Sequence, residues 1–394
     1  MMENETNLSC NISHFSREQK IHFQNYFWWV ETIGNLCGGC IGVFLNLITI
    51  HVFSSSALRK NFFNRLLICL AVFDTLYISC EISEVFRHRH NTFLQQSIFV
   101  NFVYPIRNIF MFSSVYMTVV LAFERYQAIT NPMEVRIRGI ISSMNQELLT
   151  HVLPGVIFAI IYYIPRFFEL DVEEIKRNCN KLDDVTSVSI TNLRRNPIYV
   201  FWYFIASNLT ITAVLPFLAL TFLNLKIIFS LKQFADNKQS LKTRNSLTIT
   251  DPRCSTRRKS TCCPTTDVKK TFILFSIVAL FVICHSLRVA FNIDEFIYRM
   301  SQITNNQSCR SPRVWAQYVG PFNQLLIILN SSLNFFIYTL FDIEFQNILR
   351  KRLGLNIEKQ NKMNTNTEGT RLTRNTKIFV NDKIELSNLN IIKV

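Results

Sequence analysis

The chain contains 394 residues and carries a formal net charge of +15, from 42 Lys and Arg against 27 Asp and Glu. It is 49% hydrophobic but only 18% charged, whereas a soluble domain is usually about one quarter charged. This composition excludes an ordinary soluble two-domain enzyme. The 9 glycines form no GxxxxGK or GxGxxG phosphate-binding loop.

Residues 1–26 form a polar segment that lacks the apolar core of a signal peptide. N-glycosylation triplets begin at Asn4, Asn7 and Asn11. Chance can produce such triplets in a stretch rich in Asn, Ser and Thr. Their clustering directly before the first apolar stretch nevertheless favours an extracellular, glycosylated N-terminus.

Seven apolar stretches follow, each long enough for the ~20 residues that a helix needs to cross a bilayer. They cover about 27–52, 64–86, 98–126, 148–168, 198–231, 268–297 and 314–340. Backbone polar groups inside lipid must be satisfied within each segment. We therefore expect an all-α membrane protein, a seven-helix bundle over residues 27–340 with no visible internal repeat of the transporter kind.

The remaining segments are polar. Residues 341–353 alternate apolar and polar positions at helical spacing and end in basic residues, which predicts a short amphipathic helix on the inner membrane surface. The third cytoplasmic loop, 232–267, and the tail, 354–394, are expected to be disordered. Threonines in the tail offer phosphorylation sites for arrestin, and plain solvation explains them equally well.

The basic residues are distributed unevenly between alternate loops. Ten basic and three acidic residues lie between Lys232 and Lys270, whereas the loop 166–198 has six of each. Such an excess on one side predicts that these loops are cytoplasmic and that the N-terminus is outside. The charge therefore needs no nucleic acid, and anionic lipid or a cytosolic protein is the expected partner.

Several polar side chains are expected inside the spans, where a charge costs about 2.5–3.5 kcal/mol and usually marks function. Asp74 lies at mid-depth in the second span. Polar residues on other spans could face it within one bundle interior. Unrelated interhelical hydrogen bonds would explain Ser114 alone, but they explain the group less well, because one carboxylate needs partners. The polar residues are Asn46, Ser114, Asn330, Ser331, Ser332 and Asn334.

The motifs together carry a family resemblance. The third span ends in Glu124-Arg125-Tyr126, and the seventh contains NSSLNFFIY from Asn330 to Tyr338. With Asp74 and the amphipathic helix, residues 27–353 resemble a rhodopsin-like G-protein-coupled receptor. SSVYMTVVLAFERY, YIPRFFEL and NSSLNFFIY are most similar to invertebrate FMRFamide-type neuropeptide receptors.

This resemblance implies an activation switch. Arg125 would pair at rest with Glu124, and with Asp267 at the foot of the sixth span, and would meet a heterotrimeric G protein when released. Pro132 and Met133 match the loop segment that contacts the G protein, and Pro216 the bulge-forming proline of the fifth span. The switch set also includes Tyr126, Phe281, His285, Asn334 and Tyr338.

The resemblance also implies a sodium pocket, because a hard cation prefers oxygen ligands. Its residues would be Asp74, Ser114, Asn330, Ser331 and Asn334. No other cofactor is expected.

The chain departs from the family pattern at several positions. The usual CWxP of the sixth span is Cys284-His285-Ser286-Leu287, without the tryptophan or the proline. Asn334 is followed by Phe335 instead of proline, and Asn224 replaces the usual tyrosine of the fifth span. His285 is either a pH-sensitive toggle or a neutral, hydrogen-bonded helix histidine.

Three cysteines lie in segments expected outside: Cys10, Cys179 and Cys309. The family links its second outer loop to the top of the third span, but the position matching that partner is Val100. Cys179 would therefore pair with Cys10, Cys309 or the higher-lying Cys80. A Cys10–Cys309 bridge that leaves Cys179 free also remains open.

Arg107 lies where amine receptors of this class carry an aspartate, so a protonated amine is disfavoured. Glu81 and Glu84 face it, either as an internal salt bridge or as partners of a ligand arginine. A pocket with both charges and aromatic walls suits a short amidated peptide that carries Arg and Phe. The candidate contacts are Glu81, Glu84, Tyr104, Arg107, Asn108, Arg288, Asn292 and Gln324.

Two alternatives remain. One is a receptor for a small acid or lipid, whose carboxylate Arg107 and Arg288 would clamp. The other is a transporter or channel, which leaves the ERY and NFxIY motifs unexplained. An enzyme is not expected, because no cluster of His and Asp at ligand spacing and no Ser-His-Asp set appears in the sequence.

Overall fold

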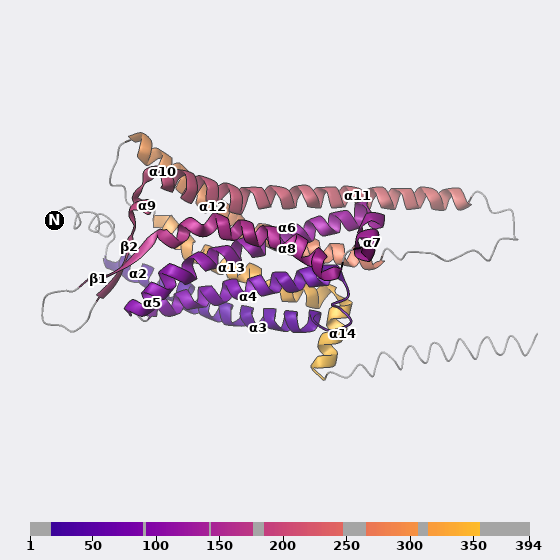
Figure 1. Cartoon of the computed structure of the whole chain (residues 1–394), viewed down its shortest axis with the longest axis horizontal. Coiled ribbons are helices and arrows are strands. Elements are labelled where there is room, and N and C mark those ends of the chain that lie inside the picture. The colour runs from indigo at the N-terminus through magenta and orange to yellow at the C-terminus, as the bar shows by residue number, and fades with distance from the viewer. Residues whose placement is uncertain are drawn as a thin grey trace, which may run out of the picture. The chain divides into compact units, whose positions relative to one another are not determined.

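A computed structural model describes residues 17–89, 92–141, 143–175, 185–246, 265–305 and 314–354. It divides the chain into two compact units, residues 1–342 and residues 343–394. The first unit contains a bundle of helices (Figure 1). Seven of its helical segments are long and apolar enough to cross a membrane, which confirms the predicted all-α seven-span architecture.

The first and third spans are each assembled from consecutive helical pieces, whereas the second is a single helix. α2 (Arg17–Phe27), the π-helical η1 (Trp28–Gly34) and α3 (Asn35–Phe53) form the first span, and α4 (Phe62–Arg89) forms the second. The third consists of α5 (Phe93–Ile98), η2 (Phe99–Val103) and α6 (Tyr104–Thr130), and α7 (Pro132–Ile141) follows it.

The fourth span is α8 (Met144–Tyr163). Its N-cap is Ser143, whose hydroxyl oxygen accepts a hydrogen bond from the Gln146 backbone amide. It ends in the 3₁₀ turn η3 (Ile164–Phe168). After the short helix α9 (Asn192–Arg195), the fifth passes through α10 (Pro197–Tyr199), η4 (Val200–Ser207), η5 (Leu209–Val214) and α11 (Leu215–Ser246). α12 (Thr265–Asn305) and α13 (Val314–Phe341) complete the bundle.

The π-helical segments η4 and η5 directly precede Pro216, the second residue of α11. Proline has no backbone N–H, so an α-helical bond cannot form at this residue. A wider π turn accommodates the interruption within the helix. α12, by contrast, passes through Cys284-His285-Ser286-Leu287 as one continuous α-helix of 41 residues, without the proline of the family pattern.

A two-stranded antiparallel sheet follows the fourth span, and the sequence analysis did not anticipate it. β1 (Leu170–Ile175) pairs with β2 (Val185–Ile190), with Leu170 opposite Ile190 and Ile175 opposite Val185. Both strands mix β-branched and polar residues, which suits a pleated, partly exposed surface. The Thr191 amide donates to the Glu169 carbonyl at 3.1 Å and closes the base of the hairpin.

The prediction of a disordered loop over 232–267 is wrong for two parts of that range. α11 continues through Ser246, and α12 already begins at Thr265 (Figure 1). The segment from Leu231 to Ser246 is polar but contains no glycine or proline, so its composition is compatible with helix. Residues 247–264 and the tail from 355 lie outside the described residues.

The predicted amphipathic segment is helical, as α14 (Ile343–Arg352). It ends in Arg350, Lys351 and Arg352, which complement the negative end of the helix dipole. α14 belongs to the second unit. Its predicted location on the inner membrane surface therefore stays a prediction.

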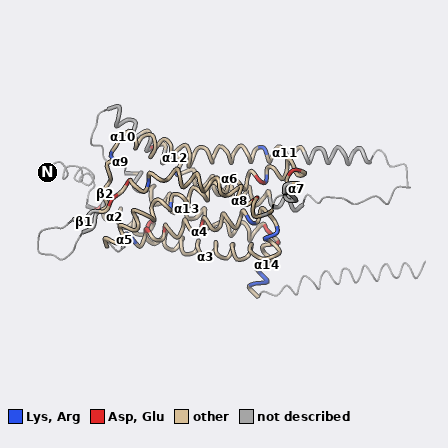
Figure 2. Tube along the Cα trace, in the orientation of Figure 1, with Lys and Arg blue, Asp and Glu red and all other residues tan. Residues whose placement is uncertain are grey.

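Close helix contacts depend on small residues at two points. A Cβ atom added to Gly42 of α3 would meet the Ser332 side chain of α13, and one added to Gly155 of α8 would meet the Tyr116 ring of α6. Only hydrogen at these positions lets the backbones approach so closely, as is common between membrane helices. Figure 2 shows that most of the helix length is uncharged and that a few charged residues lie within the bundle.

Candidate functional site

A buried carboxylate lies at the centre of the bundle. Asp74 of α4 is 1% exposed and accepts hydrogen bonds from Ser114 of α6 at 2.5 Å and from Asn334 of α13 at 3.1 Å. Asn46 of α3 donates to the Ser331 carbonyl at 2.9 Å. Four helices thus meet at one polar layer, and Ser114 and Asn334 are the predicted partners that donate to Asp74 there.

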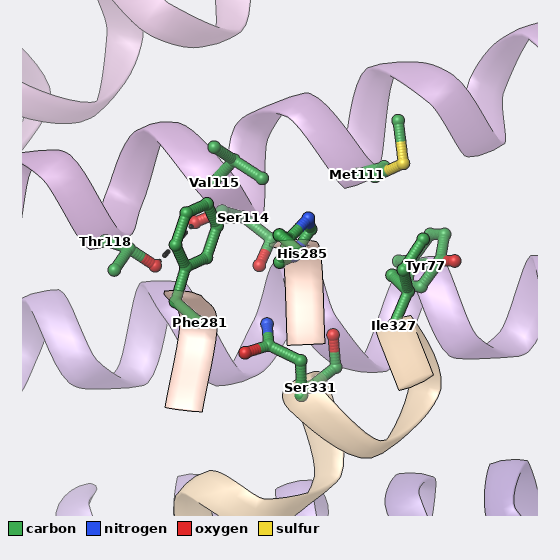
Figure 3. Close-up of a pocket in the computed structure, with 10 residues that line it drawn as sticks. Tyr77, Met111, Ser114, Val115, Thr118, Phe281, His285, Ile327 and Ser331 are labelled. Atoms are coloured by element: carbon green, nitrogen blue, oxygen red, sulfur yellow. Dashed lines mark hydrogen bonds between the residues drawn. The ribbon is translucent and has the colours of Figure 1, made fainter. Parts of the chain in front are cut away.

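A cavity of about 10 Å³ adjoins this layer (Figure 3). Its lining includes Ser114, Asn330 and Ser331 together with Phe281 and His285. That volume accommodates about one water-sized particle. The hydroxyl and amide oxygens of these residues, together with a single nearby carboxylate, are the donor set that a small monovalent hard cation prefers. The residues therefore fit the implied sodium ion.

Phe281 and His285 stack one helical turn apart on α12, with ring centroids separated by 4.2 Å. His285 is buried, and its Nε2 atom has no hydrogen-bond partner among the described residues. Both interpretations of this histidine stay predictions. His285 stands at the position where the family pattern has a tryptophan.

The other predicted switch residues lie toward the helix ends that are remote from the hairpin. Glu124 and Arg125 are both buried, and the Arg125 guanidinium lies 3.8 Å from the Phe63 ring centroid on α4. Tyr338 is buried with its ring edge toward Phe53, at 5.2 Å between centroids. The proposed ion pair of Arg125 with Glu124 stays a prediction. So does the pair with Asp267, whose side chain lies outside the described residues.

Four further residues that the family pattern singles out lie on α6, α7 and α11. Tyr126 is half-buried near the end of α6, whereas Pro132 and Met133 are exposed in the first turn of α7. Asn224, where the family has a tyrosine, donates to the Leu220 carbonyl of its own helix at 2.6 Å. The side-chain N–H group of Asn224 is therefore satisfied within α11.

In the half of the bundle nearer the β1–β2 hairpin, which is the expected extracellular side, Arg107 of α6 forms ion pairs with two glutamates of α4. It lies 3.5 Å from Glu81 and contacts Glu84 directly, and Arg87 also reaches Glu84 at 3.7 Å. The internal salt bridge weighed from the sequence is therefore present. A ligand role for the two glutamates stays a prediction. Glu31 of η1 lies within electrostatic range of this group.

The other candidate ligand contacts are dispersed around this group. Gln324 of α13 donates to the Tyr77 hydroxyl at 3.4 Å, and Asn108 donates to the Tyr104 carbonyl within α6 at 2.7 Å. Arg288 of α12 donates to the Met111 sulfur at 2.8 Å and, within the described ranges, has no carboxylate at ion-pair distance. Nothing is described for the Asn292 side chain.

A second ionic group, missed by the sequence analysis, is centred on Glu169 at the start of the hairpin. Its fully buried carboxylate accepts from Arg166 at 3.1 Å, from Arg194 at 3.0 Å and from Tyr199 at 2.7 Å. Tyr104 of α6 donates to it as well, at 3.3 Å. We refer to these five residues as the Glu169 cluster. It joins η3, α9, α10 and α6.

One sequence signal pointed toward the Glu169 cluster. Arg166 and Glu169 stand three residues apart inside the YIPRFFEL string, which is ion-pair spacing on a helical turn. Arg194 and Tyr199 lie beyond the hairpin, and no local pattern connects them to Glu169. The candidate cysteines Cys10, Cys179 and Cys309 and the glycosylation sites lie outside the described residues.

Comparisons with known proteins agree with this architecture. The family described as serpentine type 7TM GPCR chemoreceptor Srw matches residues 35–356. The FMRFamide receptor of Drosophila melanogaster is 25% identical over 362 residues, which covers 87% of this chain and 59% of the fly protein.

A second relative is the FMRFamide peptide receptor frpr-18 of Caenorhabditis elegans. It is 23% identical over 320 residues, which covers 78% of this chain and 66% of the worm protein. The chain thus spans less than two thirds of the length of each of these relatives. The matches confirm the resemblance to FMRFamide-type receptors that the motifs predicted.

Proposed function

The chain belongs to the Srw family of serpentine seven-transmembrane G-protein-coupled receptors, and from this premise we propose that it binds an extracellular FMRFamide-like neuropeptide and activates a heterotrimeric G protein. It is a multi-pass membrane protein and a receptor, not an enzyme. We place it in the plasma membrane with its N-terminus outside. The two relatives whose names include FMRFamide support the peptide class.

The observation that carries the ligand proposal is the pair of glutamates beside Arg107. Glu81 and Glu84 both form ion pairs with Arg107, and Arg87 also reaches Glu84. Carboxylates that can accept charge-assisted hydrogen bonds are therefore gathered in the outer half of the bundle. In this proposal a ligand arginine binds them there.

A ligand rich in phenylalanine requires aromatic side chains, and these lie beside Arg107 and on α12 and α13. The Arg107 guanidinium lies 5.5 Å from the Tyr104 ring centroid, and Phe291 packs edge-on against Trp315 at 6.3 Å. The Glu169 cluster adds the opposite charge, because Arg166 and Arg194 share a single carboxylate. Its excess positive charge suits the carbonyl oxygens of a peptide.

Binding would reach the G protein through the central layer. In this proposal a sodium ion, held by Asp74 with Ser114, Asn330, Ser331 and Asn334, stabilises the resting arrangement of α4, α6 and α13. Arg125, Pro132 and Met133 then form the G-protein contact at the other end of α6. Arrestin and membrane lipids are further expected partners.

The experiment is a calcium and cyclic-AMP assay in transfected cells against a library of amidated peptides. Once a peptide responds, Glu81→Gln and Glu84→Gln should each lower its potency when it contains arginine. Glu18→Gln, an exposed carboxylate at the start of α2, is the control and should leave potency unchanged. Unchanged potency in both glutamate variants would refute the ligand-arginine contact.

One observation favours the alternative of a small acidic or lipid ligand. Among the described residues, Arg288 has no carboxylate at ion-pair distance, whereas Arg107 already has two. A ligand carboxylate would therefore engage Arg288 first. Arg288→Glu should abolish the response to such an acid. The potency of an arginine-containing peptide would instead fall more on charge reversal at Glu81 or Glu84 than at Arg288.

A further inference from the structure

A pocket of about 380 Å³ opens at the end of the bundle where α3 ends and α4 and α8 begin. Its polar lining includes Ser54, Arg59, Arg65 and Asn145. The volume far exceeds the water-sized cavity beside Asp74, and it is large enough for a charged group of several heavy atoms. We refer to it as the Arg59–Arg65 pocket.

One of its two cations is held in place before any ligand arrives. Arg65 of α4 donates from Nε to the Arg59 carbonyl at 2.9 Å and from Nη1 to the Asn145 side-chain oxygen at 2.8 Å. These bonds connect the loop after α3 with α4 and α8. A guanidinium fixed in this way loses little conformational freedom when it binds an anion.

The pocket carries two positive charges and no compensating acid. None of its lining residues is acidic, and within the described ranges neither arginine has a carboxylate at ion-pair distance. Arg59 is exposed, so its guanidinium is available to a ligand. The electrostatics therefore select an anion. The planar guanidinium geometry matches phosphate oxygens in particular.

The rest of the lining is apolar, from Ile68, Cys69 and Leu148. The pocket also stands at the boundary of two spans, since one begins at Phe62 and another at Asn145. Basic residues at that depth face the headgroup region of a bilayer. A polar rim beside apolar residues suits a ligand whose phosphate continues into a glycerol and acyl chains better than it suits a free phosphate ion.

We propose that the Arg59–Arg65 pocket binds the phosphate-bearing headgroup of an anionic phospholipid from the cytoplasmic leaflet. Arg59 and Arg65 bind the phosphate oxygens, and Ser54 and Asn145 offer further hydrogen bonds. Ile68, Cys69 and Leu148 contact the start of the acyl region. The proposal rests on the proposed orientation, with the N-terminus outside, but not on the identity of the peptide ligand.

The test uses the full-length receptor in phosphatidylcholine nanodiscs, with and without phosphatidylinositol 4,5-bisphosphate. Bound lipid is counted by native mass spectrometry, and thermal unfolding is followed in parallel. The wild type should retain the anionic lipid and melt at a higher temperature in its presence. Arg59→Gln with Arg65→Gln should bind it about tenfold more weakly, because two charge-assisted contacts are lost.

Lys60→Gln is the matched control, since it removes the same charge from an exposed neighbouring position that does not line the pocket. A loss equal to that of the double variant would show diffuse attraction and overturn the proposal. Arg59→Gln alone is the second variant. It leaves the hydrogen bonds of the Arg65 side chain intact, so its weaker lipid binding cannot be attributed to a failure to fold.

Two further measurements distinguish the lipid from a soluble phosphate compound and from a protein partner. Soluble inositol 1,4,5-trisphosphate that bound as tightly as the lipid would make this a free-phosphate site and overturn the lipid assignment. The double variant should still activate a G protein in pure phosphatidylcholine. If activation were lost there, the pocket would be a protein contact instead. Because lipid is counted without peptide, failure of the ligand proposal would leave this result unaffected.

Discussion

Asn334 donates a hydrogen bond of 3.1 Å to the carboxylate of Asp74, although 260 positions of sequence separate the two residues. Ser114 completes the contact from a third helix at 2.5 Å. Bonds of this kind at mid-bundle hold α4, α6 and α13 in one register, because each polar group would otherwise be buried without a partner. The central layer is therefore both a structural junction and the proposed sodium pocket.

The first prediction concerns that ion. The wild-type receptor in detergent should melt at a higher temperature in NaCl than in KCl at equal ionic strength, because a bound ligand stabilises the folded state by mass action. Asp74→Asn removes the carboxylate charge and should abolish the difference. A thermal-shift assay measures it. A sodium-dependent increase that survives in Asp74→Asn would contradict the proposed site.

The second prediction concerns the α6–α8 contact. Gly155→Ala forces a Cβ into the Tyr116 ring and should destabilise the receptor by about 1–3 kcal/mol, as overpacking usually does. Gly38→Ala of α3 is the control, because the added Cβ would meet only the Leu325 and Ile328 side chains, at ordinary distances of 3.6 and 3.7 Å, and alanine favours helix. Thermal unfolding of the two variants should change in opposite directions. Equal stability would argue against this helix contact.

The third prediction concerns the Glu169 cluster. Glu169→Ala leaves the buried Arg166 without its acidic partner and should cost about 3–5 kcal/mol, the usual penalty for breaking a buried ion pair. Surface expression and peptide affinity should both fall, because the cluster holds the hairpin against α6. Asp171→Asn, an exposed change two residues later, serves as the control. If Glu169→Ala melted at the wild-type temperature, the Glu169 cluster would not stabilise the fold in this way.

The fourth prediction concerns the Arg125 switch. Arg125→Lys keeps the charge but loses the planar group that lies 3.8 Å from the Phe63 ring centroid, so it is not a conservative change here. We expect a reduced maximal G-protein response with peptide affinity preserved, since the ligand candidates lie at the other end of α6. Nucleotide exchange on purified G protein measures the response, and radioligand binding measures affinity. A full response would exclude a role for this stacking.

Much of the fold could be predicted from composition and periodicity. Long apolar segments must become helices in lipid, so seven spans followed directly from the sequence. The extension of α11 to Ser246 could not, because a polar segment without glycine or proline is compatible with either helix or loop. The β1–β2 hairpin was missed because short strands of mixed polarity carry only a weak local signal.

The candidate site divides in the same way. Asp74, Arg107, Glu81 and Glu84 stood out because a charge within an apolar span is rare and costly. The Glu169 cluster did not, because Arg194 and Tyr199 reach the same carboxylate only after the chain turns through the hairpin. The Arg59–Arg65 pocket likewise requires Asn145, which is 80 positions from Arg65 in the sequence.

The sequence by itself determined the class of the protein, the number of spans and the residues whose charge requires a partner, since these depend on hydrophobicity and local motifs. Only the tertiary structure decided which partners they have: Arg107 with two glutamates of α4, Arg166 and Arg194 with Glu169, and Arg65 with Asn145. Hydrogen bonds and ion pairs act over a few ångströms. They are therefore set by which helices pack together, which no local pattern encodes.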